Sequence, residues 1–158
     1  GCNPENILLS RTGHVKLADF GISKYVVDTT KTFTMCGVPD YFAPEMIANT
    51  GHDKALDWWC LGILTFELLA GYPPFESAYP MQIYEKVMRG INGVNFPNSV
   101  PALATKFIKA LLQRVPSQRL AMQNGGVSNI KTSEWLSDVP WAALENGSAD
   151  PPYLPEVE

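Results

Sequence analysis

Cysteine and histidine are scarce in this sequence of 158 residues, which contains three cysteines and two histidines. Cys2, Cys36 and Cys60 lie far apart, and no CxxC pair is present. A structural zinc site needs closely spaced ligands, and a disulfide framework needs a denser set of cysteines. These absences argue against both kinds of site. They predict a reduced chain of the cytoplasm or nucleus, and of the two we take the cytoplasm.

A long hydrophobic run and an excess of positive charge are missing as well. The most apolar segment, residues 58–66, is far shorter than the ~20 residues that a membrane-spanning helix needs. No signal peptide is visible. The formal net charge is -4, whereas binding to nucleic acid or anionic lipid calls for a basic face. We therefore expect neither a membrane span nor a nucleic-acid partner.

The residues that are present predict one domain that is mainly α. Hydrophobic residues make up 46% of the chain and charged residues 18%, which suffices for a core and argues against disorder. Two short strand-like runs, residues 7–9 and 15–17, flank a turn at residues 10–13 and predict a small β-hairpin. Residues 21–42 are polar and aperiodic. They predict a long loop, and long loops in compact domains are usually functional.

The strongest helical pattern runs over residues 54–70, with Asp53 as the N-cap and Gly71 just past the end. Apolar residues cover nearly every face of this segment, so we expect a helix that is buried on all sides. Weaker patterns predict helices over residues 81–89 and 102–113, a short broken helix over 127–136, and an extended Pro-rich tail from 146 onward.

Two polar residues flank the predicted hairpin. Asn6 precedes its first strand and Asp19 follows its second. Because the strands are antiparallel, both side chains should emerge at the same end of the hairpin. An amide oxygen and a carboxylate suit Mg²⁺, which takes few protein ligands and completes its shell with water and phosphate oxygens. A bare hairpin with polar ends explains the same two residues about as well.

Five segments, in order, resemble the motifs of protein kinases. "NPENILL" resembles the second half of the catalytic loop, "ADFG" the metal-binding motif, and "TFTMCGVPDYFAPE" an activation segment that ends in APE. "DKALDWWCLGILTFELLAGYPPF" resembles the central buried helix and its exit turn, and "RVPSQRL" the late arginine motif. The resemblance covers essentially the whole chain and implies the C-terminal (large) lobe of a Ser/Thr protein kinase.

Within that family the chain is most similar to the cyclic-nucleotide-dependent (AGC) branch. "GHDKALDWWCLGIL" and "IYEKVMRGI" resemble both the cAMP- and the cGMP-dependent enzymes, whereas "VNFPNSV", "PSQRLAMQNGGVSNIK" and "PPYLPEV" look more like the cGMP-dependent kinases. The resemblance implies a partial catalytic domain over residues 1–145 and the start of an extended tail over 146–158. A parent protein would then carry a cyclic-nucleotide-binding regulatory region, of which these residues contain nothing.

The resemblance gives roles to residues around the phosphates. It assigns Asn6 and Asp19 to the Mg²⁺ that bridges the phosphates of ATP. It matches Thr34 to the phosphorylation site of the activation loop and Lys24 to a basic residue that pairs with the phosphate. For Lys24, a solvated surface lysine is a nearly equal interpretation.

Other matched residues are structural. Glu45 of "APE" should pair with Arg119 in a buried ion pair that anchors the activation segment. Asp57, at the start of the apolar helix, should accept backbone N–H bonds from the catalytic loop, because a lone carboxylate there needs partners.

A third group of matched residues implies basic protein or peptide substrates. Glu5 and Glu67 match carboxylates that receive a substrate arginine, a pairing that is bidentate and specific. Met35, Pro39 and Phe42 match the apolar pocket for the substrate residue that follows the phosphoacceptor. A satisfied carboxylate near a helix end is the plain alternative for Glu67.

Part of the kinase machinery has no match in the sequence. There is no GxGxxG, and the strand lysine with its glutamate partner belongs to an N-terminal lobe that these residues do not contain. Alignment with the family's D-L-K-P-E-N places Gly1 at the catalytic aspartate and Asn3 at a phosphate-binding lysine. Val38 replaces a threonine that usually bonds to those two residues. We therefore expect no catalytic residue in this chain and no phosphoryl transfer by the chain alone.

Three interpretations stay open at this point. The chain is part of a Ser/Thr kinase, a pseudokinase-type scaffold, or a helical binding module without kinase chemistry. The Asn6–Asp19 pair and Thr34 favour the first, whereas Val38 and Gly1 favour the second. The third is disfavoured because Asn6 and Asp19 precede "APE" and Arg119 in the order and at the spacing of the kinase motifs.

Overall fold

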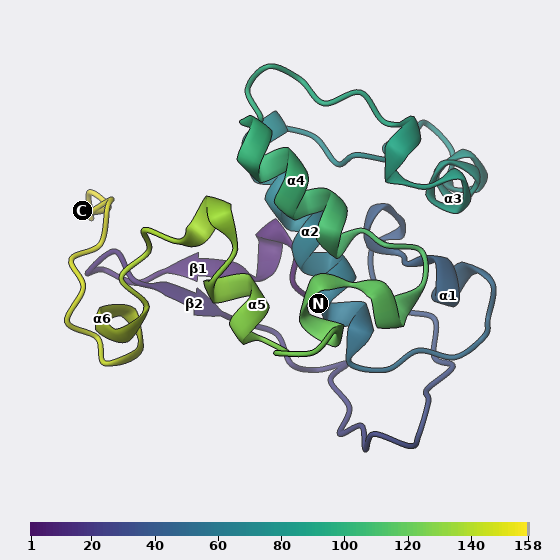
Figure 1. Cartoon of the computed structure of the whole chain (residues 1–158), viewed down its shortest axis with the longest axis horizontal. Helices are drawn as coiled ribbons and strands as arrows, with labels where there is room; N and C mark the ends of the chain where they lie inside the picture. The colour runs from purple at the N-terminus through teal and green to yellow at the C-terminus, as the bar shows by residue number, and fades with distance from the viewer. Residues whose placement is uncertain (158) are drawn as a thin grey trace.

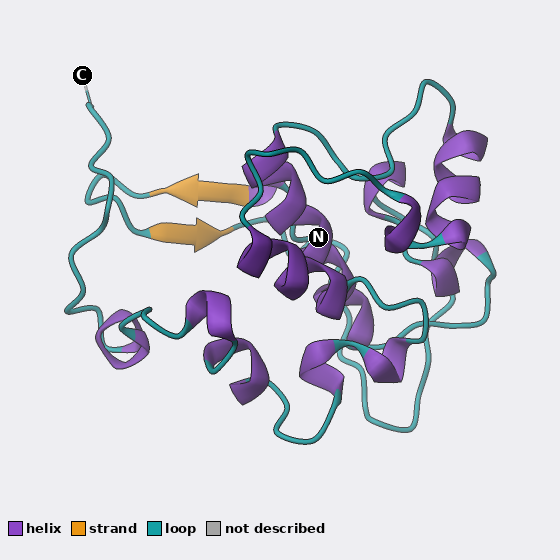
Figure 2. Cartoon of the chain, turned by 45° about the horizontal axis from the view of Figure 1, so that its top comes forward, coloured by secondary structure: helices purple, strands orange, loops and turns teal. Residues whose placement is uncertain are grey.

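The N-terminal hairpin forms over the residues that the sequence predicts. In the computed structural model, which describes residues 1–157, β1 (Ile7–Leu9) pairs antiparallel with β2 (Val15–Leu17). Ile7 lies opposite Leu17, and Leu9 lies opposite Val15. This hairpin is the only sheet in the described part of the chain (Figure 2). The remainder is helix and loop, so the prediction of a mainly α fold with one hairpin is confirmed.

The central helix, α2 (Ala55–Ala70), also begins and ends close to the predicted residues. The Asp53 carboxylate accepts a hydrogen bond of 2.9 Å from the backbone N–H of Ala55, and Gly71 ends the helix at a left-handed φ of 90°. The prediction that the helix is buried on all sides is wrong, because Leu68 is 67% exposed. Within residues 1–157 nothing covers that part of the helix.

Helix α4 (Ala102–Leu111) packs along α2 at the centre of the molecule (Figure 1). Gly62 permits this close approach, since a Cβ atom there would lie 2.7 Å from Cδ2 of Leu112 and 3.1 Å from Cβ of Leu111. Helix α4 ends two residues before the predicted boundary. Leu112 leaves the helical conformation but remains buried in the core.

Shorter elements surround this helix pair. Helix α3 (Pro80–Arg89) follows the prediction, and the broken helix appears as α5 (Ser128–Lys131) and a 3₁₀ turn. The sequence pattern missed α1 (Pro44–Ile47) and α6 (Trp141–Glu145), which are too short to show a helical period. The 3₁₀ turns are η1 (Pro4–Asn6), η2 (Pro39–Tyr41), η3 (Ile91–Gly93), η4 (Pro116–Gln118), η5 (Leu120–Met122) and η6 (Glu134–Leu136).

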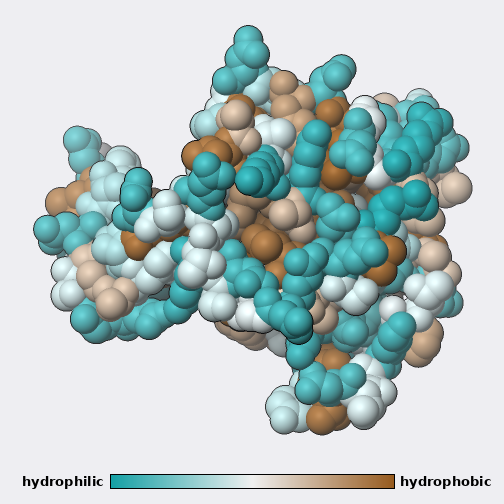
Figure 3. Space-filling view, in the orientation of Figure 1, coloured by the Kyte–Doolittle hydropathy of each residue, from teal (hydrophilic) through white to brown (hydrophobic). Residues whose placement is uncertain are grey.

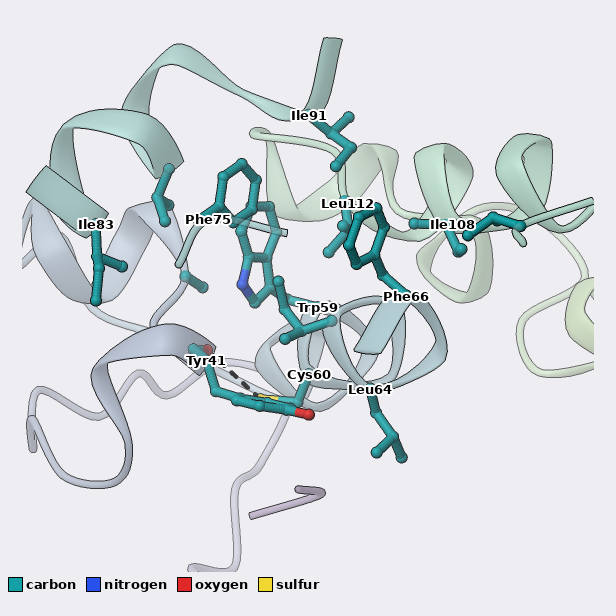
Figure 4. Packing of buried hydrophobic residues seen from close by; sticks show 14 of the residues in the cluster. Tyr41, Trp59, Cys60, Leu64, Phe66, Phe75, Ile83, Ile91, Ile108 and Leu112 are labelled. Carbon is teal, nitrogen blue, oxygen red and sulfur yellow. Dashed lines mark hydrogen bonds between the residues drawn. The ribbon is translucent and has the colours of Figure 1, made fainter. Parts of the chain in front are cut away.

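Aromatic side chains fill the core between α2 and its neighbours (Figure 4). The rings of Trp59 and Phe75 stack with their centroids 5.9 Å apart, and both side chains are fully buried. Phe66 meets Phe96 edge to face at 5.1 Å. Such pairs add about 0.5–1.5 kcal/mol to the free energy of burial. The core therefore holds α2 firmly against the residues that follow it.

The hairpin lies at the edge of the molecule, beside the C-terminal tail (Figures 1 and 3). Its side chains contribute little to the core. Four apolar residues of its strands are at least half exposed: Leu8, Leu9, Val15 and Leu17. In the turn, Gly13 has a φ of 83° and packs on the tail, so that a Cβ there would lie 3.0 Å from Cβ of Pro151 and would overlap the carbonyl oxygen of Tyr153.

None of the helices in residues 1–157 has the length and apolar character needed to cross a membrane.

Candidate functional site

The structure places Asn6 and Asp19 at the same end of the hairpin, as the topology requires. The backbone N–H of Ala18 donates to the carbonyl oxygen of Asn6 at 2.8 Å, which extends the strand pairing by one step. Asp19 comes next and has a left-handed φ of 59°. Few residues other than glycine adopt this conformation, and such positions cluster at functional sites. One oxygen of the Asp19 carboxylate accepts the N–H of Gly21 at 3.2 Å.

The oxygen atoms of Asn6 and Asp19 at this end of the hairpin are suitable ligands for a magnesium ion. The side-chain nitrogen of Asn6 donates to the carbonyl oxygen of Gly1 at 2.9 Å, whereas its amide oxygen accepts no hydrogen bond within residues 1–157. The second carboxylate oxygen of Asp19 accepts no hydrogen bond within residues 1–157. Two hard oxygen ligands fit Mg²⁺, because water and phosphate oxygens would complete the coordination shell of the ion. They do not suffice for a protein-only cage, and the described residues contain no cluster of three or more potential ligands among His, Cys, Asp and Glu.

The positions matched to catalytic residues hold small or amide side chains. Gly1 has no side chain, and a Cβ atom there would meet nothing within 4 Å. Asn3 has a buried amide oxygen without a hydrogen-bond partner. Neither residue has a side chain that could take up a proton or carry positive charge at neutral pH.

Lys24 and Thr34, which the resemblance assigns to the activation loop, lie in contact. The Lys24 ammonium donates to the hydroxyl of Thr32 at 3.0 Å and also to the hydroxyl of Thr34. Thr32 in turn forms an isolated bridge with His52, through two backbone hydrogen bonds of 2.8 Å. A phosphate on Thr34 would therefore face a cation that is already in place.

Glu45 and Arg119 form a bidentate ion pair in the interior. The two guanidinium nitrogens of Arg119 donate to the two carboxylate oxygens of Glu45 at 2.6 and 2.7 Å. Arg119 is fully buried and also donates to the carbonyl oxygens of Ala55, at 2.8 Å, and Gln113, at 3.0 Å. Its guanidinium lies 5.1 Å from the ring centroid of Trp59. The pair thus connects α1 to the start of α2 and to the segment after α4.

Glu67 lies at the hydroxyl of Tyr41, and the charges of Glu67 and Glu76 act on Asp40. This hydroxyl donates to the carboxylate of Glu67 at 2.5 Å, and burial together with that carboxylate raises the pKa of Tyr41 far above its usual value. Burial, Glu67 and Glu76 raise the pKa of the neighbouring Asp40 carboxyl. Glu5 is exposed in η1.

Asp40 is a candidate that the sequence analysis did not include. One of its carboxylate oxygens is buried and has no hydrogen-bond partner in residues 1–157. A buried acceptor without a partner costs free energy, and a cationic donor that binds it would remove this cost. The sequence offers no clear signal for Asp40. The nearness of Glu76 arises only in the folded chain.

The three residues matched to an apolar substrate pocket differ in exposure. Met35 is half exposed and Pro39 is half-buried in η2, whereas Phe42 is buried and stacks on Tyr84 of α3 with ring centroids 6.0 Å apart. Val38 is 38% exposed and uses its carbonyl oxygen to accept the N–H of Tyr41. Phe42 can therefore offer one face of a pocket, while Met35 is available for contact.

Asp57 lacks the partners that we predicted for it. Its side chain is exposed and accepts no hydrogen bond within residues 1–157. Partial desolvation raises the pKa of its carboxyl above the ordinary value of 3.8. Burial, followed by the Asp57 charge, raises the pKa of the Cys2 thiol. The predicted bonds are not formed because the described residues bring no backbone N–H group to this carboxylate.

Replacing Asp57 by asparagine should stabilise this chain at neutral pH. A raised pKa means that ionisation of the carboxyl disfavours the folded state, and this penalty is complete above the folded pKa. We expect Asp57→Asn to raise the melting temperature at pH 7. The gain in unfolding free energy should be less than about 1 kcal/mol, because the group is exposed. The gain should shrink as the pH falls toward 3.8. A loss of stability at pH 7 would reveal a hydrogen-bond donor to Asp57.

Comparison with known proteins places this site in a family. A family model described as the protein kinase domain matches residues 3–136. The chain therefore belongs to the protein kinase family, and its fold is that of a kinase C-terminal lobe.

Among characterised members, it is similar to cyclic-nucleotide-dependent kinases of the AGC branch. It is 44% identical to a cGMP-dependent protein kinase of Drosophila melanogaster (isozyme 2, forms cD5/T2), over 98% of this chain and 17% of that protein. It is 44% identical to isozyme 1 from the same organism, over 96% of this chain and 20% of that protein. It is 43% identical to the human cAMP-dependent protein kinase catalytic subunit PRKX, over 98% of this chain and 42% of that protein. The chain thus spans less than half the length of these relatives.

Proposed function

We propose that this chain supplies the metal-binding and substrate-binding part of a Ser/Thr kinase that phosphorylates basic proteins, in the manner of cGMP-dependent kinases. The observation that carries the proposal is the position of Asn6 and Asp19 at the same end of the hairpin, where Asp19 has a left-handed φ of 59°. Protein kinases use ATP and Mg²⁺, and these two residues would hold the ion. When bound, the ion neutralises the phosphate charge that develops during transfer.

Glu67 and Asp40 would recognise arginine in the substrate. Glu67 is held in place by the Tyr41 hydroxyl, and Asp40 has a buried oxygen without a partner. Glu5 and Glu76 are exposed and would add negative charge. Guanidinium groups pair with carboxylates in a bidentate and specific manner, which favours basic substrates.

The remaining parts of an active kinase would come from outside these residues. A glycine-rich loop, a lysine–glutamate pair and a catalytic aspartate are needed. The exposed apolar strands β1 and β2 offer a surface against which an N-terminal lobe could pack. A cyclic-nucleotide-binding region would regulate the complete protein, and residues 146–158 would begin its C-terminal tail.

A scaffold without phosphoryl transfer is the second candidate, and Val38 is the observation that favours it. The family places a threonine at this internal position, where its hydroxyl supports the catalytic aspartate and lysine. Val38 cannot make those bonds. Gly1 and Asn3 agree with this interpretation, although they lie at the start of the sequence. Reading the genomic sequence upstream of Gly1 would show whether a glycine-rich loop and an aspartate are encoded.

A chimera separates the two candidates experimentally. The N-terminal lobe and catalytic loop of human PRKX would be joined ahead of Pro4, supplying an aspartate and a lysine at the positions of Gly1 and Asn3. We expect transfer of phosphate from ATP to an arginine-rich peptide. Asp19→Ala should reduce the rate by at least about a hundredfold, because the metal contributes several kcal/mol of charge stabilisation. Activity that appears only with Val38→Thr would mean that valine blocks catalysis. No activity in either form would favour the scaffold.

The 158-residue chain by itself should transfer no phosphate. It offers neither a general base at Gly1 nor a cation at Asn3, and positioning plus charge stabilisation supplies most of the rate in this reaction. The assay is the same radiolabel transfer to an arginine-rich peptide, with the PRKX chimera as the positive control. Robust turnover by the chain that Asp19→Ala abolishes would show that these residues suffice for catalysis.

A further inference from the structure

A cavity of about 650 Å³ opens beside the Glu45–Arg119 pair, away from the residues assigned to metal and substrate. Its walls come from four separate parts of the chain: Lys31, and residues within the stretches 44–51, 88–92 and 112–118. Of the residues to which the kinase resemblance assigns a role, only Glu45 lines it. The cavity therefore needs an explanation of its own.

Positive charge dominates its lining. Lys31, Arg89 and Arg114 all contribute to the walls, their side chains are exposed, and none forms an ion pair within residues 1–157. Glu45 is the one acidic residue among the lining residues, and Arg119 binds both of its carboxylate oxygens. The cavity thus carries uncompensated positive charge, although the whole chain has a net charge of -4.

Two glycines hold the stems of the basic side chains at the cavity. A Cβ atom on Gly51 would lie 3.0 Å from Cβ and Cδ of Lys31, and one on Gly90 would lie 3.3 Å from Cδ of Arg114. Both glycines are buried and have left-handed φ values, of 83° and 92°. The long side chains therefore rest on bare backbone, which limits their freedom before any ligand arrives.

Apolar side chains complete the lining. Ile91 and Leu112 are buried at its base, and Met88 and Val115 also belong to the wall. Its volume lies within the ~300–1,000 Å³ range of ligand-binding clefts. A lone phosphate would use the cations but leave the apolar wall bare. A peptide that carries carboxylates around an apolar side chain would use both.

We propose that this cavity binds an acidic peptide segment of a partner protein. Carboxylates of the peptide pair with Lys31, Arg89 and Arg114, and an apolar side chain packs against Met88 and Val115. Such a ligand would join Lys31 of the activation segment to the turn after α3 and the loop after α4. It would thereby hold the activation segment from the side of the Glu45–Arg119 pair, independently of the substrate site.

Fluorescence anisotropy with the 158-residue chain tests the proposal. The probe is a labelled peptide of alternating Glu and Leu, compared with one in which Gln replaces Glu and one in which Ala replaces Leu. We expect the Glu/Leu peptide to bind, and to bind more weakly as salt is raised. Each replacement peptide should bind at least about tenfold more weakly. Equal binding of the Gln peptide, or full displacement by millimolar inorganic phosphate, would overturn the proposal.

Matched variants locate the binding on the protein. Arg89→Glu and Arg114→Glu should each weaken binding at least about tenfold, and Lys31→Gln should weaken it less. Arg11→Glu and Lys16→Glu make the same change of charge on the hairpin and should alter binding by less than about twofold. All five side chains are exposed, so melting temperatures should stay close to that of the parent chain. An equal loss in the hairpin variants would show non-specific attraction and would overturn the site.

Discussion

Arg119→Ala is expected to lower the free energy of unfolding by about 3–5 kcal/mol, because it leaves the Glu45 carboxylate buried without its partner. Arg119 also satisfies the carbonyl oxygens of Ala55 and Gln113, which would both lose a donor. The guanidinium packs on Trp59 as well, so that a cavity would open in the core. Thermal unfolding followed by circular dichroism should show a melting temperature lower by about 10 °C or more.

Two further variants identify the cause of that loss. Arg119→Lys keeps the charge but cannot make the bidentate contact, and it should also destabilise the chain strongly. The double variant Glu45→Ala with Arg119→Ala should lose less stability than the sum of the single losses, because it leaves no buried charge unpaired. An unchanged melting temperature for Arg119→Ala would show that the ion pair contributes nothing to stability.

Trp59→Ala should have an effect of similar size, about 3–5 kcal/mol, for a different reason. The Trp59 ring is fully buried, stacks on Phe75 and lies beneath the Arg119 guanidinium. Its removal leaves an internal cavity that the packed aromatic rings around it cannot fill. Chemical denaturation with urea should show a lower midpoint with an unchanged slope.

Trp59→Phe is the control for that experiment. The indole nitrogen is buried and has no hydrogen-bond partner within residues 1–157, so that phenylalanine sacrifices no hydrogen bond. It also keeps an aromatic face for Phe75. We expect Trp59→Phe to lower the free energy of unfolding by less than half as much as Trp59→Ala does. A phenylalanine variant as unstable as the alanine variant would mean that the indole nitrogen has a role that ring packing does not explain.

Local sequence patterns predicted the elements of this fold well. The strands at 7–9 and 15–17 were correct to the residue, since a glycine turn between two apolar runs determines a hairpin. The central helix was correct to one residue at its start, because Asp53 and Gly71 are strong end signals. The ordered motifs also predicted the protein kinase family, which the comparison confirms.

Features that depend on distant parts of the chain could not be predicted in this way. Composition alone did not reveal that Leu68 is exposed, because burial depends on which elements lie opposite. Asp57 was predicted to have backbone donors that the described residues do not bring to it. Asp40 lacked an obvious signal because Glu76 approaches it only after folding. The cationic cavity likewise joins Lys31 to Arg114, which lie far apart in the sequence.

The contact between Gly13 and the tail has a consequence for the order of folding. The β1–β2 turn closes over a few residues, which is a fast local event, whereas the contact with Pro151 and Tyr153 closes a loop of nearly the whole chain. The entropy of loop closure grows with loop length, so this contact should form after the helices have assembled. Docking of residues 151–153 on the hairpin turn would then be a late step of folding, although the hairpin itself forms early.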